Sequence, residues 1–581
     1  MNSSKPFLPT IKAIAVLLLL AGCTPAVASP TPSATAAPSP TAIAAPAPAE
    51  PWWNQAVFYE VFVRSFADST SGHLAYDGIG DLAGLIEKLD YLNDGDPATS
   101  DDLGVTALWL MPTMQSPSYH GYDITDYYTV NTDYGYNADF IRLMDEAHRR
   151  GIRVVIDLVL NHTSDQHPWF IEARNDPTSA RRDWYIWSES QPTYTGPWGE
   201  QVWFESPSGY YYGVFGANMP DLNYTNPAVT AEMGEVARFW LGLGADGFRL
   251  DAARYLIEEG EAQADTASTH AWWKQFRTVY KAANPQAVTV GEVAASRYAI
   301  ADYLQGDELD LAFDFPLAEA VVRGISARNA PQLQSALTES YSQFGSDRSA
   351  TFLSNHDMSR LMSRIAGQTD KAKLAAMLLF TAPGVPFIYY GEEIGMTGDK
   401  PDPGIRTPMQ WSAEENAGFT AGSPWEAVNA DYVQVNVAAQ SADPDSLLSC
   451  YRDMIHLRLA HPALQSGDYA PVESGSKTLL AFLRTENAAE GAGTFSGTFG
   501  SSPEETLLVV INLGGKPASG YELALKAGNL SGVYRASLVY GGEAELPGLQ
   551  SVNTAGGFDS YAPAVEIPGN GMIVIQLQAG R

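Results

Sequence analysis

The fold of this chain is decided by four short segments: VVIDLVLNH (Val154–His162), DGFRLD (Asp246–Asp251), VTVGEV (Val288–Val293) and TFLSNHD (Thr351–Asp357). Each reads as a buried β-strand, because a run of apolar residues ends in polar and ionisable ones. In a parallel α/β barrel the strand ends meet at one face, and active sites form there. The four segments therefore predict that their terminal polar groups converge.

Strand-like and helix-like patterns alternate on either side of these segments, from Trp52 onward. This alternation is typical of a parallel sheet with crossover helices and predicts an α/β fold, a (β/α)8 TIM barrel. The predicted strands are Ala56–Phe66, Val105–Met111, Arg153–Leu160, Gly247–Asp251, Val288–Val293, Leu309–Phe315, Ala350–Ser354 and Val385–Tyr390. Predicted helices between them include Asp81–Leu92, Asn137–Arg150, Ala228–Gly242, Ala271–Ala283 and Lys371–Phe380.

Two further domains are predicted around this catalytic barrel, which we place at residues 51–466. The alternation stops over 163–223, a segment rich in Trp and Tyr. Structureless loops of that length are uncommon in compact domains, so we expect an inserted subdomain there. Over 467–581 short strands alternate with Gly-rich turns, which predicts an all-β C-terminal domain, a β-sandwich.

The N-terminus has the features of an export signal rather than of a folded element. Lys5 and Lys12 precede an apolar run, Ala13–Leu20, that is too short to span a bilayer. The following Leu-Ala-Gly-Cys resembles a bacterial lipobox, which implies a lipoprotein signal peptide over 1–23 and a lipidated Cys23. The alternative is an ordinary secretory signal. Residues 24–50, mostly Ala, Pro, Ser and Thr, should form an extended tether. We therefore expect an extracytoplasmic protein, anchored to the cell membrane through lipid only.

Composition excludes several classes of protein. The 581 residues include 35 basic and 67 acidic ones, giving a net charge of −32. A polyanion without basic clusters repels phosphates, so no nucleic-acid partner is expected. Cys450 is the only cysteine besides Cys23, which excludes a disulfide framework and indicates a packed structural thiol. We expect a monomer.

Three of the strand ends supply carboxyl groups, namely Asp251, Glu292 and Asp357. Glycoside hydrolysis with retention needs one carboxylate to attack the anomeric carbon and one carboxylic acid to protonate the leaving oxygen. Arg249 lies two residues before Asp251, so both share one face of a strand, and its guanidinium would keep Asp251 ionised. The pKa of Glu292 should be raised, so that it stays protonated near neutral pH. The alternative for each Asp is a helix cap.

The ordered set of motifs resembles the α-amylase clan of glycoside hydrolases, over about residues 52–464. Its parts are Asp157 with Asn161-His162, then Met219–Asn223 (MPDLN), Arg249 with Asp251, Glu292, and Asn355-His356-Asp357. The resemblance implies that Asp251 is the nucleophile, Glu292 the general acid/base and Asp357 a third carboxylate that grips substrate hydroxyls. It also implies that His162 and His356 donate hydrogen bonds to the sugar. In His120-Gly121-Tyr122-Asp123, it implies that Tyr122 stacks on that sugar.

Two features bear on specificity. The MPDLN sequence resembles a subgroup intermediate between oligo-1,6-glucosidases and neopullulanases, several of which are lipoprotein α-amylases. Asp123 and Arg406, in the RTPMQW loop of residues 406–411, match glucosidase residues that close the pocket at the non-reducing end. Ala252, where a Val would favour α-1,6 bonds, favours α-1,4.

We therefore predict a secreted α-amylase acting on starch or maltodextrins. The enzymatic alternatives are an exo-acting α-glucosidase or a neopullulanase-like enzyme. Trehalose synthase is less favoured, because export and tethering suit polymer breakdown. The alternative from a different class is a non-catalytic surface protein that binds glucan.

A calcium site is one interpretation of the loop after the first strand, and no organic cofactor is expected. Asp68, Asp77, Asp81 and the Ile79 carbonyl would offer the oxygen ligands that Ca²⁺ prefers. The alternative is a polar turn. A second calcium site of the family uses a residue matching Asn161, but Tyr255 stands where its usual His follows the fourth strand.

Overall fold

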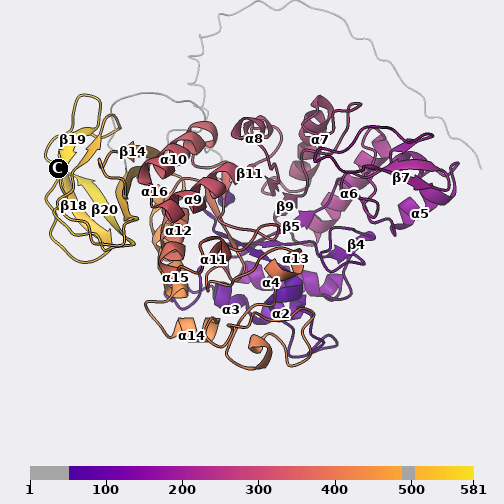
Figure 1. Cartoon of the computed structure of the whole chain (residues 1–581), viewed down its shortest axis with the longest axis horizontal. Coiled ribbons are helices and arrows are strands. Elements are labelled where there is room, and N and C mark those ends of the chain that lie inside the picture. The colour runs from indigo at the N-terminus through magenta and orange to yellow at the C-terminus, as the bar shows by residue number, and fades with distance from the viewer. Residues whose placement is uncertain (1–50, 487–503, 581) are drawn as a thin grey trace, which may run out of the picture. The chain divides into compact units, whose positions relative to one another are not determined.

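The computed structural model describes residues 51–486 and 504–580, and Figure 1 labels its elements. The predicted signal peptide, Cys23 and tether lie outside these residues. Within the described part, no helix is both long and apolar enough to cross a membrane.

Eight parallel strands close into a barrel, as the alternating pattern predicts. Around the barrel, hydrogen-bonded neighbours follow chain order, so consecutive strand ends lie side by side. The strands are β1 (Phe58–Val61), β2 (Ala107–Leu110), β5 (Arg153–Leu158), β9 (Gly247–Leu250), β10 (Val288–Gly291), β11 (Leu311–Phe313), β12 (Ser349–Thr351) and β13 (Val385–Tyr389).

Amphipathic helices connect these strands. They are α2 (Leu82–Glu87), α3 (Leu89–Leu92), α4 (Asn137–Arg149), α6 (Pro227–Gly242), α7 (Ala267–Ala283), α8 (Arg297–Tyr303), α9 (Phe315–Ala327), α10 (Ala330–Phe344), α11 (Leu361–Arg364) and α12 (Thr369–Thr381). Polar caps set their starts: the side chains of Asn226, Thr266 and Asp314 accept hydrogen bonds from the first turns of α6, α7 and α9. The outer faces of the strands pack on these helices in one large apolar core.

Aromatic side chains fill the barrel interior. Phe58 stacks on Phe387 with ring centroids 4.3 Å apart, and Trp109 lies 5.3 Å from Phe313. Trp109 also lies beneath the strand ends, 5.2 Å from the guanidinium of Arg249 and 5.5 Å from the ring of His356. The core therefore supports the polar groups at the mouth of the barrel.

The first strand is shorter than the sequence predicts. It stops at Val61, and α1 (Val63–Phe66) follows it. The backbone carbonyls of Arg64 and Ser65 leave the sheet and accept from the N–H groups of Gly80 and Met409, both at 2.8 Å. These contacts with distant loops outweigh the strand pattern of the segment. The small hairpin of β3 (Met114–Gln115) and β4 (Asp126–Val130) was also not predicted.

An antiparallel three-stranded sheet forms the inserted subdomain after β5, which confirms that prediction. Its elements are α5 (Pro168–Asn175), the 3-10 helix η2 (Arg182–Trp184), β6 (Trp187–Ser188), β7 (Trp203–Ser206) and β8 (Gly209–Tyr212). Arg181 and Arg182 stack over Trp184 and Trp187, at 3.6 and 3.4 Å from the ring centroids. The N–H of Leu222 donates to the carbonyl of Asn161 at 2.9 Å, which joins the subdomain to the end of β5.

Two antiparallel sheets that share one apolar core make up the C-terminal domain. One contains β14 (Asp468–Val472), β15 (Leu479–Glu486), β16 (Glu505–Asn512), β20 (Gly571–Ala579) and β18 (Tyr534–Tyr540), and the other β17 (Leu523–Leu525) and β19 (Phe558–Tyr561). The segment before them contains α13 (Asp402–Ile405), α14 (Val437–Ser441), α15 (Leu447–Ala460) and α16 (Pro462–Gln465). The buried Arg484 of β15 donates to the carbonyl of Thr381 on α12 at 2.8 Å, which fastens the sheet to the barrel. Cys450 is a buried free thiol.

Candidate active site

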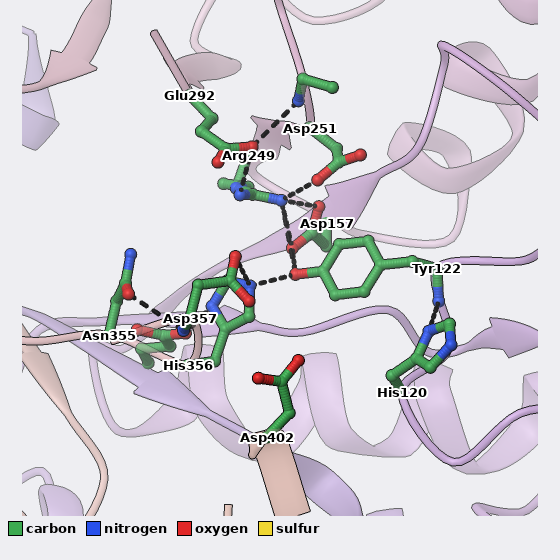
Figure 2. Close-up of polar contacts among 12 residues, drawn as sticks. His120, Tyr122, Asp157, Arg249, Asp251, Glu292, Asn355, His356, Asp357 and Asp402 are labelled. Carbon is green, nitrogen blue, oxygen red and sulfur yellow. Dashed lines mark hydrogen bonds and ion pairs between the residues drawn. The ribbon is translucent and has the colours of Figure 1, made fainter. Parts of the chain in front are cut away.

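Arg249 is the centre of a cluster of carboxyl groups at the barrel mouth (Figure 2). Its side chain is 1% exposed. One terminal nitrogen, Nη1, donates to Asp157 Oδ1 at 2.9 Å and to Asp251 Oδ1 at 2.7 Å. The other, Nη2, lies 2.9 Å from Glu292 Oε2. The planar fork of a guanidinium suits such multiple contacts. Asp251 and Glu292 therefore flank the same small space.

The register of the barrel explains this convergence. Arg249 pairs with Asp157 on β5 and with Val290 on β10, so Asp251 and Glu292 follow two strands that are direct neighbours. As the sequence predicts, Arg249 and Asp251 share the inward face. The sequence predicts that Asp251 is ionised, but burial opposes ionisation and raises the pKa of its carboxyl. Arg249 lowers that pKa, and the charges of Glu292 and Asp157 raise it again.

Ala252, directly after Asp251, adopts a left-handed backbone conformation with φ 49°. Non-glycine residues rarely adopt it, and it recurs at functional sites. Here it directs the backbone N–H of Ala252 to Glu292 Oε2, at 3.0 Å. Glu292 is therefore fixed through one oxygen by two donors, the N–H of Ala252 and Arg249.

A second group of charged side chains consists of Glu60, His356 and Asp357. His356 Nδ1 lies 2.6 Å from Glu60 Oε1, and its Nε2 lies 3.2 Å from Asp357 Oδ2. Burial alone would lower the pKa of His356, but Asp357 and Glu60 outweigh it and raise the pKa to about 9. Burial would raise the pKa of Asp357, yet His356 and Arg406 hold it well below its ordinary range. Near neutral pH, a charged imidazolium therefore donates to both carboxylates.

Tyr122 connects this group to the carboxyl cluster around Arg249. Its hydroxyl donates to Asp157 Oδ2 at 2.9 Å and lies 2.7 Å from His356 Nε2. The ring stacks on His356 with centroids 5.5 Å apart and planes inclined by 15°. Burial and the charge of Asp157 raise the pKa of the hydroxyl well above its ordinary value, so it stays protonated. The half-buried ring is held rigidly at the cavity.

A cavity of about 400 Å³ opens above these groups. Seven of the predicted site residues line it: His120, Tyr122, His162, Asp251, Glu292, Asp357 and Arg406. His162 Nε2 lies 3.1 Å from the carbonyl of Tyr122, and burial lowers the pKa of His162 to about 3, so this ring is neutral. Arg249 and His356 support the lining residues through the contacts above.

Asp123, which the sequence predicts to bind substrate, lies in the turn that carries His120 and Tyr122, and its substrate contact stays a prediction. Its carboxylate accepts from the hydroxyl of Ser116 at 2.7 Å and from that of Ser118, and it is absent from the cavity lining. These contacts let Asp123 fix the turn that carries His120 and Tyr122. The serine-rich stretch just before it is the sequence signal for this role.

Three residues of the site were missed in the sequence. Glu60 is an acidic residue inside the apolar β1, which is the signal that identifies it. Asp402 lines the cavity and lies 3.2 Å from Arg406 Nη2, whose other contact is Asp357 at 2.9 Å. Trp198 also lines the cavity, from the inserted subdomain. Only the fold shows that these residues meet.

The four residues of the predicted calcium loop do not fit a metal ion. Both oxygens of Asp68 accept from backbone N–H groups of the loop, at 3.0 and 2.9 Å. Asp81 caps α2, and Asp77 accepts from the N–H of Ile79 at 2.9 Å. No group of three or more His, Cys, Asp or Glu side chains within residues 51–486 and 504–580 is arranged to hold a metal ion. These contacts are those of the alternative, a polar turn.

Another set of oxygens fits a cation better. Asn161 Oδ1, Asp221 Oδ2 and Glu258 Oε1 are buried and have no hydrogen-bond partner. The Asn161 amide and the Glu258 carboxyl both act on Asp221, so the three side chains lie together. Burial raises the pKa of Asp221, the charge of Glu258 raises it further, and burial raises that of Glu258 to about 7. Two carboxyls and an amide oxygen are ligands that Ca²⁺ takes.

The site as a whole combines three carboxyl groups, a buried guanidinium and an aromatic face at the mouth of a parallel barrel. Paired carboxyls at the strand ends of a parallel barrel are the groups that a glycoside hydrolase uses.

Comparisons with known proteins give the family. The family model described as "Alpha amylase, catalytic domain" matches residues 60–467. "Alpha-amylase 3" of Dictyoglomus thermophilum is 39% identical, over 74% of this chain and 83% of its own length. An oligo-1,6-glucosidase of Parageobacillus thermoglucosidasius is 33% identical, over 75% of this chain and 88% of its own length. The crystal structure of the α-amylase from H. orenii matches with a TM-score of 0.76 and 37% identity, covering 90% of this chain and 99% of that one. The chain belongs to the α-amylase family of glycoside hydrolases.

Proposed function

We propose that this glycoside hydrolase is an α-amylase that cleaves α-1,4-glucosidic bonds of starch or maltodextrins by double displacement. The observation that carries the proposal is one buried guanidinium, Arg249, that holds Asp251 and Glu292 at the same cavity as Asp357. All three carboxyls line that cavity, which favours an enzyme over a non-catalytic glucan-binding protein.

In the first step, ionised Asp251 attacks the anomeric carbon while protonated Glu292 gives its proton to the leaving oxygen. Arg249 contacts both groups and favours the negative charge on Asp251. In the second step, Glu292 takes a proton from water, which opens the ester between Asp251 and the sugar. Asp357 binds sugar hydroxyls, and Tyr122 offers the face on which the ring rests.

Asp251→Asn tests this assignment. We expect turnover of maltohexaose to fall by at least roughly a thousandfold, because the attacking oxygen is lost. The matched control is Asp314→Asn, since Asp314 is buried directly after β11, caps α9 and is absent from the cavity lining. Asparagine also caps helices, so this control should stay active. Undiminished turnover of Asp251→Asn would show that the nucleophile is another group.

Exo-acting α-glucosidase activity is the second candidate. Arg406 bonds both Asp357 and Asp402, and these contacts place a charged barrier at one end of the cavity. Such a barrier suits binding of a non-reducing end. Chromatography of early products from maltohexaose, amylose and pullulan separates the two candidates. Internal cuts that give maltose and maltotriose support the α-amylase, whereas release of glucose alone contradicts it.

We also propose that the protein is exported and held at the cell membrane by a lipid on Cys23. The support is the Leu-Ala-Gly-Cys sequence after an apolar run and the long tether that follows. Expression of the full chain and of Cys23→Ser, followed by membrane fractionation, tests this. The wild-type chain should sediment with membranes and the variant should not. Equal partition of the two would contradict the anchor.

We propose that any calcium ion binds at Asn161, Asp221 and Glu258 rather than in the loop of Asp68. An ion there would neutralise two buried carboxyls and tie the inserted subdomain to β5. Thermal unfolding with EDTA and with added CaCl₂ tests this. Calcium should raise the midpoint for the wild type and for Asp68→Asn, but not for Asp221→Asn. An equal rise in Asp221→Asn would place the ion elsewhere.

A further inference from the structure

A second cavity lies outside the active site, between the loop after β1 and the helices α2 and α4. Its volume is about 390 Å³, close to that of the active-site cavity, and the two cavities share no lining residue. The helices α2 and α4 pack on each other beside it, and the loop of residues 69–74 supplies the rest of its lining together with residues 134 and 135. The proposed mechanism uses none of these residues.

The loops that line this cavity lie on the same face of the barrel as the catalytic site. Residues 69–74 follow β1, and residues 134–142 follow β2, so both belong to connections that leave the carboxyl ends of strands. The connection after β2 also carries Tyr122, which lines the active-site cavity. A long polymer chain on this face of the barrel therefore meets loops of both cavities.

Two aromatic rings form a platform at the rim of the second cavity. The imidazole of His73, which lines the cavity, stacks on the ring of Tyr136, with centroids 5.0 Å apart and planes inclined by 12°. Tyr136 is 58% exposed, and His73 is exposed as well. Contiguous exposed rings beside a cavity are typical of a ligand-binding site. A flat ring offers apolar area to the apolar face of a pyranose.

Hydrogen bonds hold the platform in place without a ligand. The N–H of Tyr136 donates to Asp139 Oδ2 at 3.0 Å, which fixes the turn into α4. On the opposite side, the hydroxyl of Ser69 donates to Asp81 Oδ2 at 2.7 Å, which fixes the start of the loop to α2. A surface that is already ordered loses less conformational entropy when it binds a ligand.

Polar groups of both kinds line the cavity beside the platform. The carboxylates of Glu87 and Glu146 accept hydrogen bonds, whereas the guanidinium of Arg142 and the hydroxyl of Ser71 donate them. The side chain of Arg142 is 52% exposed and lies 3.7 Å from Asp139 Oδ1, which is too long for a hydrogen bond and leaves donors available to a ligand. Donors and acceptors beside an apolar face suit a neutral polyhydroxyl ligand rather than an ion.

We propose that His73 and Tyr136 form an auxiliary binding site for an α-glucan chain, with Arg142 and Glu87 as hydrogen-bond partners of its hydroxyls. The inference rests on the proposed function, since the ligand is the polymer that the enzyme cleaves. A chain bound there has a higher effective concentration at Asp251, provided that it is long enough to reach both cavities. Long chains therefore gain from the site, and short oligosaccharides do not.

Adsorption to insoluble starch tests the binding step without turnover. Asp251→Asn is the background, because it leaves the polymer intact. Tyr136→Ala in this background should lower the association constant roughly fivefold or more, as removal of an aromatic contact residue does. Tyr136→Phe should retain adsorption, because the ring remains. Tyr298→Ala is the matched control, since Tyr298 is 76% exposed and lines neither cavity.

Kinetics on a long and a short substrate, with Asp251 intact, give a second readout. For amylose, kcat/KM of Tyr136→Ala should fall roughly threefold or more, whereas for maltohexaose it should change by less than about twofold. Unchanged adsorption of Tyr136→Ala, or equal kinetic losses on both substrates, would overturn the inference. If the wild type cleaves neither substrate, the proposed function fails, and adsorption alone then decides whether the second cavity binds glucan.

Discussion

Replacing Glu60 by glutamine should move the alkaline limb of the pH–activity profile to lower pH. Glu60 lies behind the substrate cavity, 2.6 Å from Nδ1 of His356, and has no contact with the sugar in the proposed mechanism. The substitution keeps the shape of the side chain and removes its charge. His356 is then stabilised in its charged form by Asp357 and no longer by Glu60.

The size of the effect follows from the pKa of His356. Its rise from 6.5 to about 9 corresponds to roughly 3 kcal/mol in favour of the imidazolium, at about 1.4 kcal/mol per pKa unit. Removal of one nearby opposite charge usually lowers such a pKa by about one to three units. In Glu60→Gln, the imidazolium that donates to Asp357 should therefore be lost near neutral pH rather than near pH 9. The stability that this pair contributes is full below pH 6.5 and is lost as pH rises through the folded-state pKa.

The assay is kcat/KM for maltohexaose between pH 5 and 10, which reports groups of the free enzyme. The alkaline limb should begin at least about one unit lower in Glu60→Gln than in the wild type. Glu393→Gln is the control: Glu393 is also buried, and it accepts from the hydroxyl of Tyr59 rather than from His356. An alkaline limb that stays in place in Glu60→Gln would refute the coupling of Glu60 to Asp357 through His356.

Two further predictions concern stability. Burial raises the pKa of Glu392 to about 8, so the wild type should lose stability between pH 4.5 and 8, at up to about 1.4 kcal/mol per pH unit. Glu392→Gln removes this loss. Urea unfolding of both proteins should therefore show a difference in unfolding free energy that grows in favour of the variant as pH rises. A difference that does not depend on pH would contradict the reasoning. Ala252→Val places a β-branched side chain at φ 49° and should lower the unfolding free energy by roughly 1–2 kcal/mol. It should also lower kcat for maltohexaose, because the N–H that fixes Glu292 shifts, whereas unaltered stability and kcat would show that the backbone adapts without cost.

The sequence by itself determined the barrel and the three carboxyls of the site. Each barrel strand leaves a local signal, an apolar run that ends in polar residues, and the ends of parallel strands meet by geometry. The sequence alone therefore predicts that Asp251 and Glu292 lie together. The same local signals predict a first strand that is too long. Arg64 and Ser65 lie outside the sheet, because their carbonyls accept hydrogen bonds from loops that are distant in the chain.

Only the tertiary structure decided what surrounds those carboxyls. Glu60 and His356 are 296 residues apart in sequence, and no local pattern relates them. The structure also joined Asp123 to two serines and brought Asp402 and Trp198 to the cavity. Local propensity fixes where elements begin and end, whereas burial and long-range charge fix which side chains meet. The groups that set the charge states and the extent of the cavity therefore come from distant segments, which the folded chain alone brings together.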